Sequence, residues 1–194
     1  MLPSSLFEEF GHDPQLWAVV EELLQDEVPL ADGTEQPRQR PSDYQAQKQW
    51  SSGKKKQHTQ KTQVLGTSDG LEIVDVIVGV PGPTSGINLL RQQQKHFDSP
   101  QQFMGDKAYL GAEHTTTPYK KPRNQTLSET KQQENQVISG QRICIEPLIR
   151  RLKIFRILTH WFRLNSRFYD SVMRAICGLV RLRLGRLDFT VYDT

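Results

Sequence analysis

The sequence predicts an α/β domain in which helices pack on a mixed β-sheet. Three observations support this prediction: strand-like runs come early, a helical segment separates them from further short strands, and amphipathic helical patterns close the chain. The chain has 194 residues, which is close to the usual size of one domain, so we expect one hydrophobic core. Its hydrophobic residues, 36% of the total, come in dense blocks separated by polar segments, which indicates a folded chain.

The N-terminal part of the chain reads as a helix, a strand and a loop. Asp13 and Pro14 form an N-cap and first-turn pair, and the apolar residues that follow recur at helical spacing, so we expect a helix over residues 14–25. Residues 28–31 are a short apolar run that predicts a strand. The polar stretch over residues 35–61 then predicts a long loop.

A hairpin is expected next. The dipeptide Asp69-Gly70 favours a type I′ turn and lies between two strand-like runs, residues 62–67 and 71–80. The second run is nearly continuous in β-branched residues, so we expect it to be buried on both faces.

The middle of the chain alternates between helical and strand signals. Residues 81–86 are rich in Pro and Gly, so we expect them to interrupt regular secondary structure, and residues 87–97 then predict a helix. Short strands are expected at residues 102–104 and 115–119. The polar segment over residues 120–136 predicts either a loop or a solvated helix.

Two helices are expected at the C-terminal end. Residues 143–162 carry an apolar stripe of period 3.6 with basic residues between, and residues 169–187 form a second basic helical pattern. Between Arg150 and Arg186 there are ten Lys or Arg against one acid, Asp170, so the local charge is 10 − 1 = +9, although the whole chain carries only +3. This bias predicts a polyanionic partner; the alternative is that arginine stems cover the apolar face of the sheet.

Cysteine usage and the N-terminus bear on the compartment. Cys144 and Cys177 can supply neither a disulfide framework nor a four-thiolate zinc site, which favours a reducing compartment. The first residues lack a signal-peptide pattern, and no run approaches 18 uninterrupted apolar residues. We therefore expect a cytoplasmic protein with no membrane segment.

Three carboxylates are candidates for chemistry. Asp32 and Asp106 each follow a predicted strand, where a rigidly held carboxylate can bind a hard divalent cation; the alternative is a turn former or helix cap. Glu146 follows Arg142 by four residues and precedes Lys153 by seven, so the three would share one face of a helix within an arc of roughly 40°. The alternative is an ordinary ion pair on a solvated surface.

Pro147 directly follows Glu146 and complicates this shared face. Proline inside a helix removes a hydrogen bond and costs about 3 kcal/mol, so it is tolerated only in the first turn. If the helix begins there, Arg142 precedes the helix proper and the shared-face argument does not apply to it.

Five segments of the chain, in this order, resemble the catalytic domain of the DDE transposases of bacterial insertion sequences, a Harbinger-like DDE superfamily endonuclease domain. They are DGTEQP at Asp32, SGKKKQHTQKTQV from Ser52, GDKAYLG around Asp106, TTPYKKPR from Thr116, and the spacing of Arg142, Glu146 and Lys153. The resemblance covers residues 2–187 and implies a ribonuclease H-like fold. It divides the chain into a helical lead-in (1–27), a catalytic domain (28–187) and a tail (188–194).

The resemblance also implies a chemistry. Asp32, Asp106 and Glu146 would bind Mg²⁺ or Mn²⁺, two ions in all, and water or a 3′-hydroxyl would attack a DNA phosphodiester, giving cleavage and strand transfer during transposition. The basic residues expected to contact DNA are Lys54, Lys55, Lys56, Lys61, Lys107, Lys120, Lys121, Arg142, Arg150 and Lys153.

The expected partners follow from the same resemblance. They are DNA, as transposon ends and as target, a second copy of the chain on that DNA, and a helix-turn-helix region supplied by an upstream reading frame; the protein would then be nucleoid-associated. Many relatives have Tyr three residues before the Arg of the signature helix, and Ser139 stands at that position here. The alternative function is a catalytically silent, truncated DNA-binding remnant of a transposase.

Overall fold

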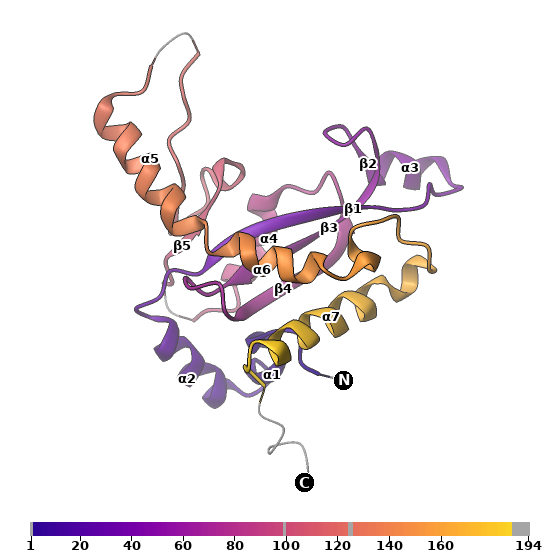
Figure 1. Cartoon of the computed structure of the whole chain (residues 1–194), viewed down its shortest axis with the longest axis horizontal. Helices are drawn as coiled ribbons and strands as arrows, with labels where there is room; N and C mark the ends of the chain where they lie inside the picture. The colour runs from indigo at the N-terminus through magenta and orange to yellow at the C-terminus, as the bar shows by residue number, and fades with distance from the viewer. Residues whose placement is uncertain (1, 99, 124–125, 188–194) are drawn as a thin grey trace.

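A mixed sheet with helices on both faces forms the body of the protein (Figure 1). The structure is a computed structural model that describes residues 2–98, 100–123 and 126–187, so the predicted tail at 188–194 lies outside the described residues. The six strands of this part are β1 (Leu30–Pro37), β2 (Ser51–Ser52), β3 (Gln57–Gly66), β4 (Ile73–Pro81), β5 (Phe103–Gly105) and β6 (Thr115–Thr116). Their arrangement is consistent with a ribonuclease H-like fold, which confirms the predicted fold class.

The sheet combines antiparallel and parallel pairing. Its order is β2-β3-β1-β5-β6, and β4 also pairs with β3. β3 is antiparallel to β1, β2 and β4, whereas β5 is parallel to both β1 and β6. β1 therefore lies at the centre, between an antiparallel hairpin and a parallel segment.

Seven α-helices are found in the described residues. They are α1 (Leu6–Phe10), α2 (Pro14–Leu24), α3 (Tyr44–Trp50), α4 (Gly86–Gln94), α5 (Glu129–Arg142), α6 (Ile145–Lys153) and α7 (Tyr169–Arg183), and short 3₁₀ turns lie at η1 (Lys107–Tyr109), η2 (Arg156–Leu158) and η3 (Ser166–Phe168). None of these helices is both long and apolar enough to cross a membrane.

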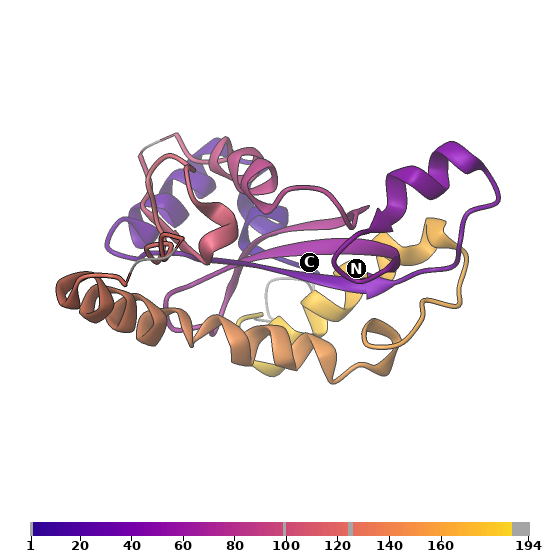
Figure 2. The ribbon, with the colours of Figure 1, turned by 90° about the horizontal axis from the view of Figure 1, so that it is seen from above.

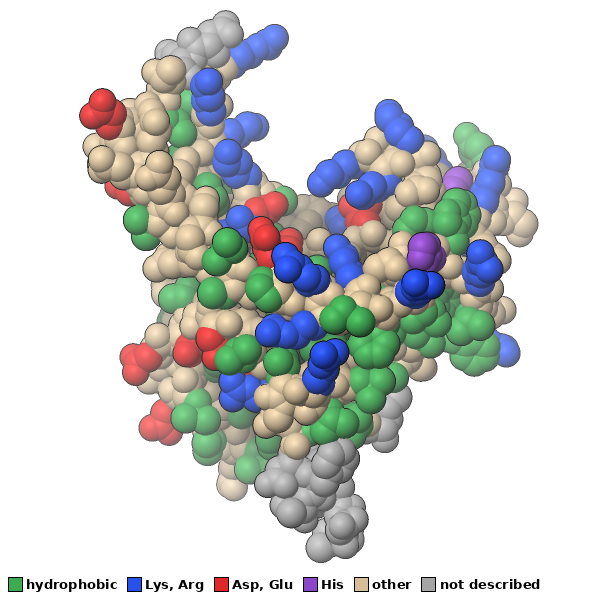
Figure 3. Space-filling view, viewed as in Figure 1, with side chains coloured by type: hydrophobic (Ala, Val, Ile, Leu, Met, Phe, Trp, Pro, Cys, Tyr) green, Lys and Arg blue, Asp and Glu red, His purple; other side chains and the backbone are tan. Residues whose placement is uncertain are grey.

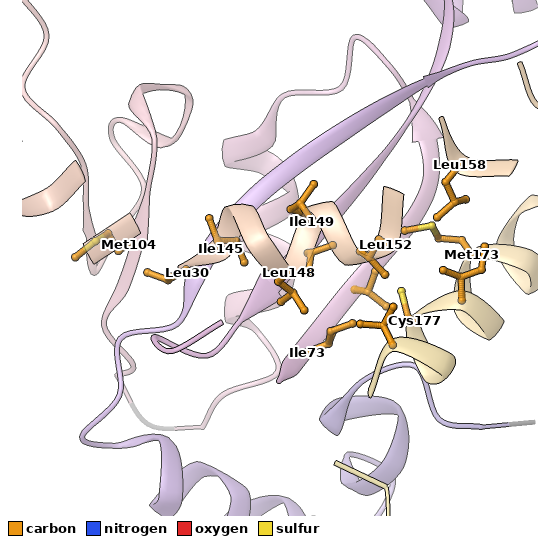
Figure 4. Packing of buried hydrophobic residues seen from close by; sticks show 14 of the residues in the cluster. Leu30, Ile73, Met104, Ile145, Leu148, Ile149, Leu152, Leu158, Met173 and Cys177 are labelled. Atoms are coloured by element: carbon orange, nitrogen blue, oxygen red, sulfur yellow. The ribbon is translucent and has the colours of Figure 1, made fainter. Parts of the chain in front are cut away.

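The alternation of side chains along the strands creates two cores, one on each face of the sheet, where we expected a single one. Leu30 and Val64 face the layer of α6 and α7, whereas the adjacent residues Ala31 and Leu65 face the layer of α2 and α4. Figure 2 shows these two helical layers on opposite sides of the sheet. In the first core, Leu148 of α6 packs with residues of β4 and α7 (Figure 4).

Several sequence predictions are confirmed. Asp13 caps α2 by accepting backbone N–H bonds, and α2 covers nearly the predicted helix. The hairpin pairs as β3 and β4, and helices occur at α4 and α7. Strands occur at β5 and β6, although β6 is shorter than expected. The polar segment after residue 120 leads into the largely solvated helix α5, the second of its two predicted alternatives.

The loop predicted over residues 35–61 is wrong. β1 continues to Pro37, β3 already begins at Gln57, and α3 and β2 lie between them. Several polar side chains of the paired strands β1 and β3, which we call the β1–β3 ribbon, are buried, and the Gln36 amide donates to the carbonyls of Ile157 and His160. Such pairing makes burial of a polar strand tolerable, so polarity alone gave a false loop signal.

Two further details differ from expectation. The hairpin connection is longer than a two-residue type I′ turn, which needs positive φ at both central residues, and here Gly70 has positive φ (67°) but Asp69 does not. β4 is buried only over its first four residues, because it forms an edge of the sheet and α1 and α7 cover it in part.

The long helix predicted over residues 143–162 is divided. α6 begins at Ile145, so Pro147 lies in its first turn, and α6 ends at Lys153 before the 3₁₀ turn η2. Arg142 belongs instead to the end of α5. The predicted single helical face for Arg142, Glu146 and Lys153 is therefore wrong for Arg142.

The hairpin turn supports the start of α6. Gly70 lies so close to the junction of α5 and α6 that a Cβ added there would be 2.0 Å from the Cys144 carbonyl oxygen. Arg151 of α6 also donates to the Gly70 carbonyl (3.4 Å). The turn thereby places α6 over the centre of the sheet.

Gly70→Ala should destabilise the fold by at least about 2 kcal/mol, because the positive φ strains an alanine by roughly 1–2 kcal/mol and the Cys144 carbonyl must move. Gly53→Ala is the matched control, since nothing lies within 4 Å of a Cβ at Gly53. Urea unfolding measures both variants. Equal stability of the two would contradict the close approach.

A buried arginine joins three distant segments. Arg181 of α7 is fully buried, and it donates to Glu72 (2.7 Å) before β4, to Glu9 of α1 (2.8 Å) and to the Pro3 carbonyl (3.1 Å). These bonds tie the N-terminal segment and the hairpin to α7.

Arg181→Met should lower the free energy of unfolding by roughly 3–5 kcal/mol, because it leaves the buried Glu72 carboxylate without its cation. Arg183→Met, at an exposed position of the same helix, should change it by less than about 0.5 kcal/mol. Chemical denaturation distinguishes these outcomes, and a small effect at Arg181 would refute the proposed role of this ion pair in stability.

Candidate active site

Asp32 and Asp106 lie side by side at the centre of the sheet. β1 and β5 run parallel, and their last matched pair is Ala31 with Gly105. The next residue after each member of this pair is an aspartate, so Asp32 and Asp106 follow this pair directly, and the charge of Asp106 acts on Asp32. Strand pairing thus joins two residues that are 74 positions apart in the chain (106 − 32).

Backbone hydrogen bonds hold one oxygen of each carboxylate. Oδ1 of Asp32 accepts from the N–H of Gly33 (2.8 Å), and Oδ1 of Asp106 accepts from the N–H of Ala108 (2.7 Å) as the cap of η1. In the described ranges, no hydrogen bond reaches the second oxygen of either side chain. Each aspartate therefore keeps one oxygen available to a ligand.

The electrostatic surroundings of Asp32 combine opposing effects. Burial raises the pKa of the Asp32 carboxyl above its usual value, and the negative charge of Asp106 raises it further. The Gly33 N–H, Arg142 and Lys153 act in the opposite direction. The net shift is upward, so an ionised Asp32 is held at a cost that a bound cation would relieve.

The two predicted DNA-binding cations of the signature helix therefore lie near Asp32. Arg142 ends α5 and Lys153 ends α6, so they approach the aspartate from two separate helices. The Nε of Arg142 is buried and has no hydrogen-bond partner in the described part of the chain. The carboxylate that lies near both cations is therefore Asp32, whereas the sequence pattern predicted Glu146.

Glu146 is placed differently from the two aspartates. It is exposed in the first turn of α6, a helix that packs against β1 and β3. Over residues 2–98, 100–123 and 126–187, no three His, Cys, Asp or Glu side chains are grouped closely enough to hold a metal ion. The structure therefore brings together two of the three predicted carboxylates.

The paired aspartates nevertheless suit a hard divalent cation. Mg²⁺ prefers oxygen ligands and is commonly bound through one or two carboxylates, with water and substrate phosphates completing its coordination. Asp32 and Asp106 offer this donor set on rigid elements. The residues present thus fit Mg²⁺ or Mn²⁺.

Tyr109 belongs to the site although its sequence pattern did not reveal a role. The buried ring packs so tightly on Gly105 that a Cβ there would lie 2.5 Å from it, and the hydroxyl is 3.2 Å from the Gln63 amide. Burial and the charges of Asp32 and Asp106 raise the pKa of the phenol, so it stays protonated. The only sequence signal was its place three residues after Asp106, which a 3₁₀ turn brings back over the strand.

Basic side chains surround the acidic centre. Figure 3 shows a hollow between α5 and the projection formed by α3, β2 and the start of β3, with basic side chains on both walls and acidic ones at its floor. The predicted DNA-binding residues that are exposed are Lys54, Lys55, Lys56, Lys107, Lys120, Lys121, Arg150 and Lys153.

Lys61 differs from these exposed cations. Its Nζ donates to the Thr84 carbonyl and lies 3.8 Å from Glu35, which also accepts from the hydroxyls of Ser52 and Thr59. Burial lowers the pKa of Lys61, although Glu35 partly offsets the effect. The structure therefore gives Lys61 partners in β1 and in the segment between β4 and α4.

The mixed sheet is consistent with a ribonuclease H-like fold, and the paired aspartates with cations near them are what we expect of a nuclease of that fold. In agreement, the chain belongs to the DDE superfamily endonuclease family, whose pattern matches residues 31–181. This finding confirms the resemblance that the five sequence segments predict.

One curated relative extends this assignment. The probable transposase for insertion sequence element IS702 from Microchaete diplosiphon is 30% identical to the chain over 164 residues, which cover 82% of this chain and 58% of the relative. The chain therefore spans less than two thirds of that protein. No solved structure matches the chain.

Asp32→Asn should raise the melting temperature at pH 7, by about 2–4 °C for each kcal/mol gained, because it removes a carboxylate whose ionised form is disfavoured in the folded state. The Asp32 carboxyl binds its proton more tightly in the folded than in the unfolded state, so the parent becomes more stable as the pH falls through the raised pKa. The difference in stability between variant and parent should therefore disappear below pH 3.8, the usual pKa of an aspartate. Thermal unfolding over a pH series checks this, with the exposed Asp26→Asn as control. A variant less stable than the parent at pH 7 would contradict the sign.

Proposed function

We propose that the chain is the catalytic part of an insertion-sequence transposase that cleaves DNA phosphodiester bonds and transfers the cut strand. The single observation that carries this proposal is the parallel register that sets Asp32 beside Asp106. Divalent cations bound there would activate the attacking oxygen and stabilise the leaving one.

The protein's own residues would divide the remaining work. Backbone hydrogen bonds would hold the Asp32 and Asp106 carboxylates in place, and Tyr109 would remain a neutral phenol packed against Gly105, directly before Asp106. Arg142 and Lys153 lie near enough to Asp32 to attract a phosphate to the same place. We assign Glu146 as the third carboxylate, because it is exposed and accepts no hydrogen bond in the described part of the chain.

The hollow is the proposed path of the DNA. Its acidic floor lies between two basic walls (Figure 3), and a duplex placed there would meet cations on both sides. The exposed lysines before α5 and those between β2 and β3 would contact its phosphates. This arrangement supports the predicted DNA partner, both as transposon end and as target.

Two further partners belong to this proposal. We propose that a helix-turn-helix region supplied by an upstream reading frame recognises the transposon ends, as the family resemblance implies. We also propose that two copies act together, since transposition joins two DNA ends.

Asp32→Asn, Asp106→Asn and Glu146→Gln should each reduce Mg²⁺- or Mn²⁺-dependent nicking of supercoiled plasmid by on the order of a hundredfold or more. Each change keeps the side-chain volume and removes one charged ligand. Asp26→Asn, which lies outside the site, should nick like the parent. Nicking by the Asp32 and Asp106 variants at the parental rate would overturn the proposal, and a folded parent that never nicks would favour the silent remnant.

Mg²⁺ binding can be measured without any reaction. The ion should stabilise the parent, by about 2.7 kcal/mol at a concentration 100 times its dissociation constant, and should stabilise Asp32→Asn much less. Thermal unfolding in a Mg²⁺ series, with Ca²⁺ as comparison, gives the answer. Equal stabilisation of both proteins would place the ion elsewhere.

A further inference from the structure

The segment that joins α6 to α7 exposes an unusual number of large hydrophobic side chains. We call residues 154–168 the basic-aromatic strip. The exposed hydrophobic side chains of this strip are Ile154 (58%), Ile157 (37%), Trp161 (51%), Leu164 (48%) and Phe168 (45%). Single exposed apolar residues are common, but such a concentration along one segment marks an interaction surface.

The strip and most of the helix before it contain basic but no acidic residues. From residue 147 to residue 169 the sequence contains no Asp or Glu, and its six Lys and Arg are Arg150, Arg151 and Lys153 of α6 and Arg156, Arg163 and Arg167 of the strip. Figure 3 shows hydrophobic and basic side chains interleaved on this side of the molecule, on the same face as the hollow. A matching partner must therefore be an anion that also presents flat apolar surfaces.

The backbone next to Trp161 is anchored, and an open recess lies beside its side chain. The next residue, Phe162, is buried, its N–H donates to the Pro37 carbonyl (3.1 Å), and its ring meets that of Tyr169 edge-on at 5.1 Å. Trp161 and Arg163 line a recess of about 470 Å³. The exposed indole is thus held at the end of β1, next to a cation and a space that a planar group can enter.

Arginine and aromatic rings already pair in this region. The guanidinium of Arg167 lies 4.6 Å from the centre of the Phe168 ring, and that of Arg38 lies 3.8 Å from the Trp50 ring. Such pairs leave a ring or a guanidinium plane on which a further flat group can stack.

We propose that the basic-aromatic strip binds single-stranded DNA, with an unpaired base stacked on Trp161 and neighbouring phosphates held by Arg163 and Arg156. Unpaired bases combine a π-face with a backbone charge, which is the chemistry that this surface matches. Duplex DNA does not match it equally, because its bases are already stacked on each other. The inference deepens the proposed function and rests on it for biological meaning: it adds an unpaired strand to the substrate.

The test measures binding of a fluorescein-labelled oligothymidylate and of a duplex of equal length by anisotropy, in EDTA. Trp161→Ala in the full chain should weaken single-strand binding roughly 5- to 100-fold and change duplex binding by less than about twofold. Trp161→Phe keeps an aromatic face and should recover most of the affinity. Leu23→Ala removes a hydrophobic side chain from α2 that is even more exposed (72%) and should have no effect.

Two further readouts separate stacking from charge. Single-strand binding should quench tryptophan fluorescence in the parent and much less in Trp161→Phe, since Trp17 is buried and the half-buried Trp50 ring is already stacked under the Arg38 guanidinium. Arg163→Ala should reduce the dependence of log affinity on log salt by about 0.7, the value for one lost phosphate contact.

The opposite outcomes are equally definite. A folded Trp161→Ala variant that binds the oligonucleotide like the parent would overturn the inference, as would equal losses on single strand and duplex. Conversion of a self-associated parent to a monomer by Trp161→Ala, with DNA binding unchanged, would assign the strip to contact between copies. The two proposals can fail separately. Asp32→Asn should retain single-strand binding, and parental nicking by that variant would refute the catalytic proposal without affecting the inference that the strip binds a single strand.

Discussion

The parallel pairing of β1 with β5 is the constraint on which the candidate site depends. β5 is only three residues long, yet the side chains of Phe103 and Met104 are buried on opposite faces of the sheet. Their N–H groups donate to the carbonyls of His114 (2.8 Å) and Pro29 (3.0 Å). A slip of one residue would send both side chains to the wrong core. The cores therefore maintain the register, and the register places the two aspartates together.

The helices that cover this sheet also determine its electrostatics. α5 and α6 end with the cations that face Asp32, and the hairpin turn at Gly70 holds the junction between these helices. α7 in turn is tied to the hairpin by Arg181 and Glu72. The fold thus pairs the buried Arg181 with carboxylates, whereas the cost of partly burying Asp32 is only partly compensated by the cations near it. Such a difference is typical of functional sites, where stability is given up for reactivity.

Features that depend on one segment of the chain were predictable from the sequence, and features that depend on contacts between distant segments were not. The helix after Asp13 was predictable because its cap and periodicity lie within one segment. The β1–β3 ribbon was missed because buried polar residues such as Gln36 find their partners about 120 positions away, in the segment before Phe162. The break before α6 was foreseeable from Pro147, whereas the position of Arg142 beside Asp32 depended on how two helices cross the sheet.

The sequence by itself determined most element types, the basic C-terminal region and the acidic residues available for chemistry, because these depend on composition and short-range spacing. Only the tertiary structure decided which of them meet. It paired Asp32 with Asp106, left Glu146 exposed on α6, gave Lys61 partners at Glu35 and Thr84 and exposed Trp161 beside Arg163. The physical reason is that strand register and helix packing are set by burial of side chains far apart in the chain, which no local pattern encodes.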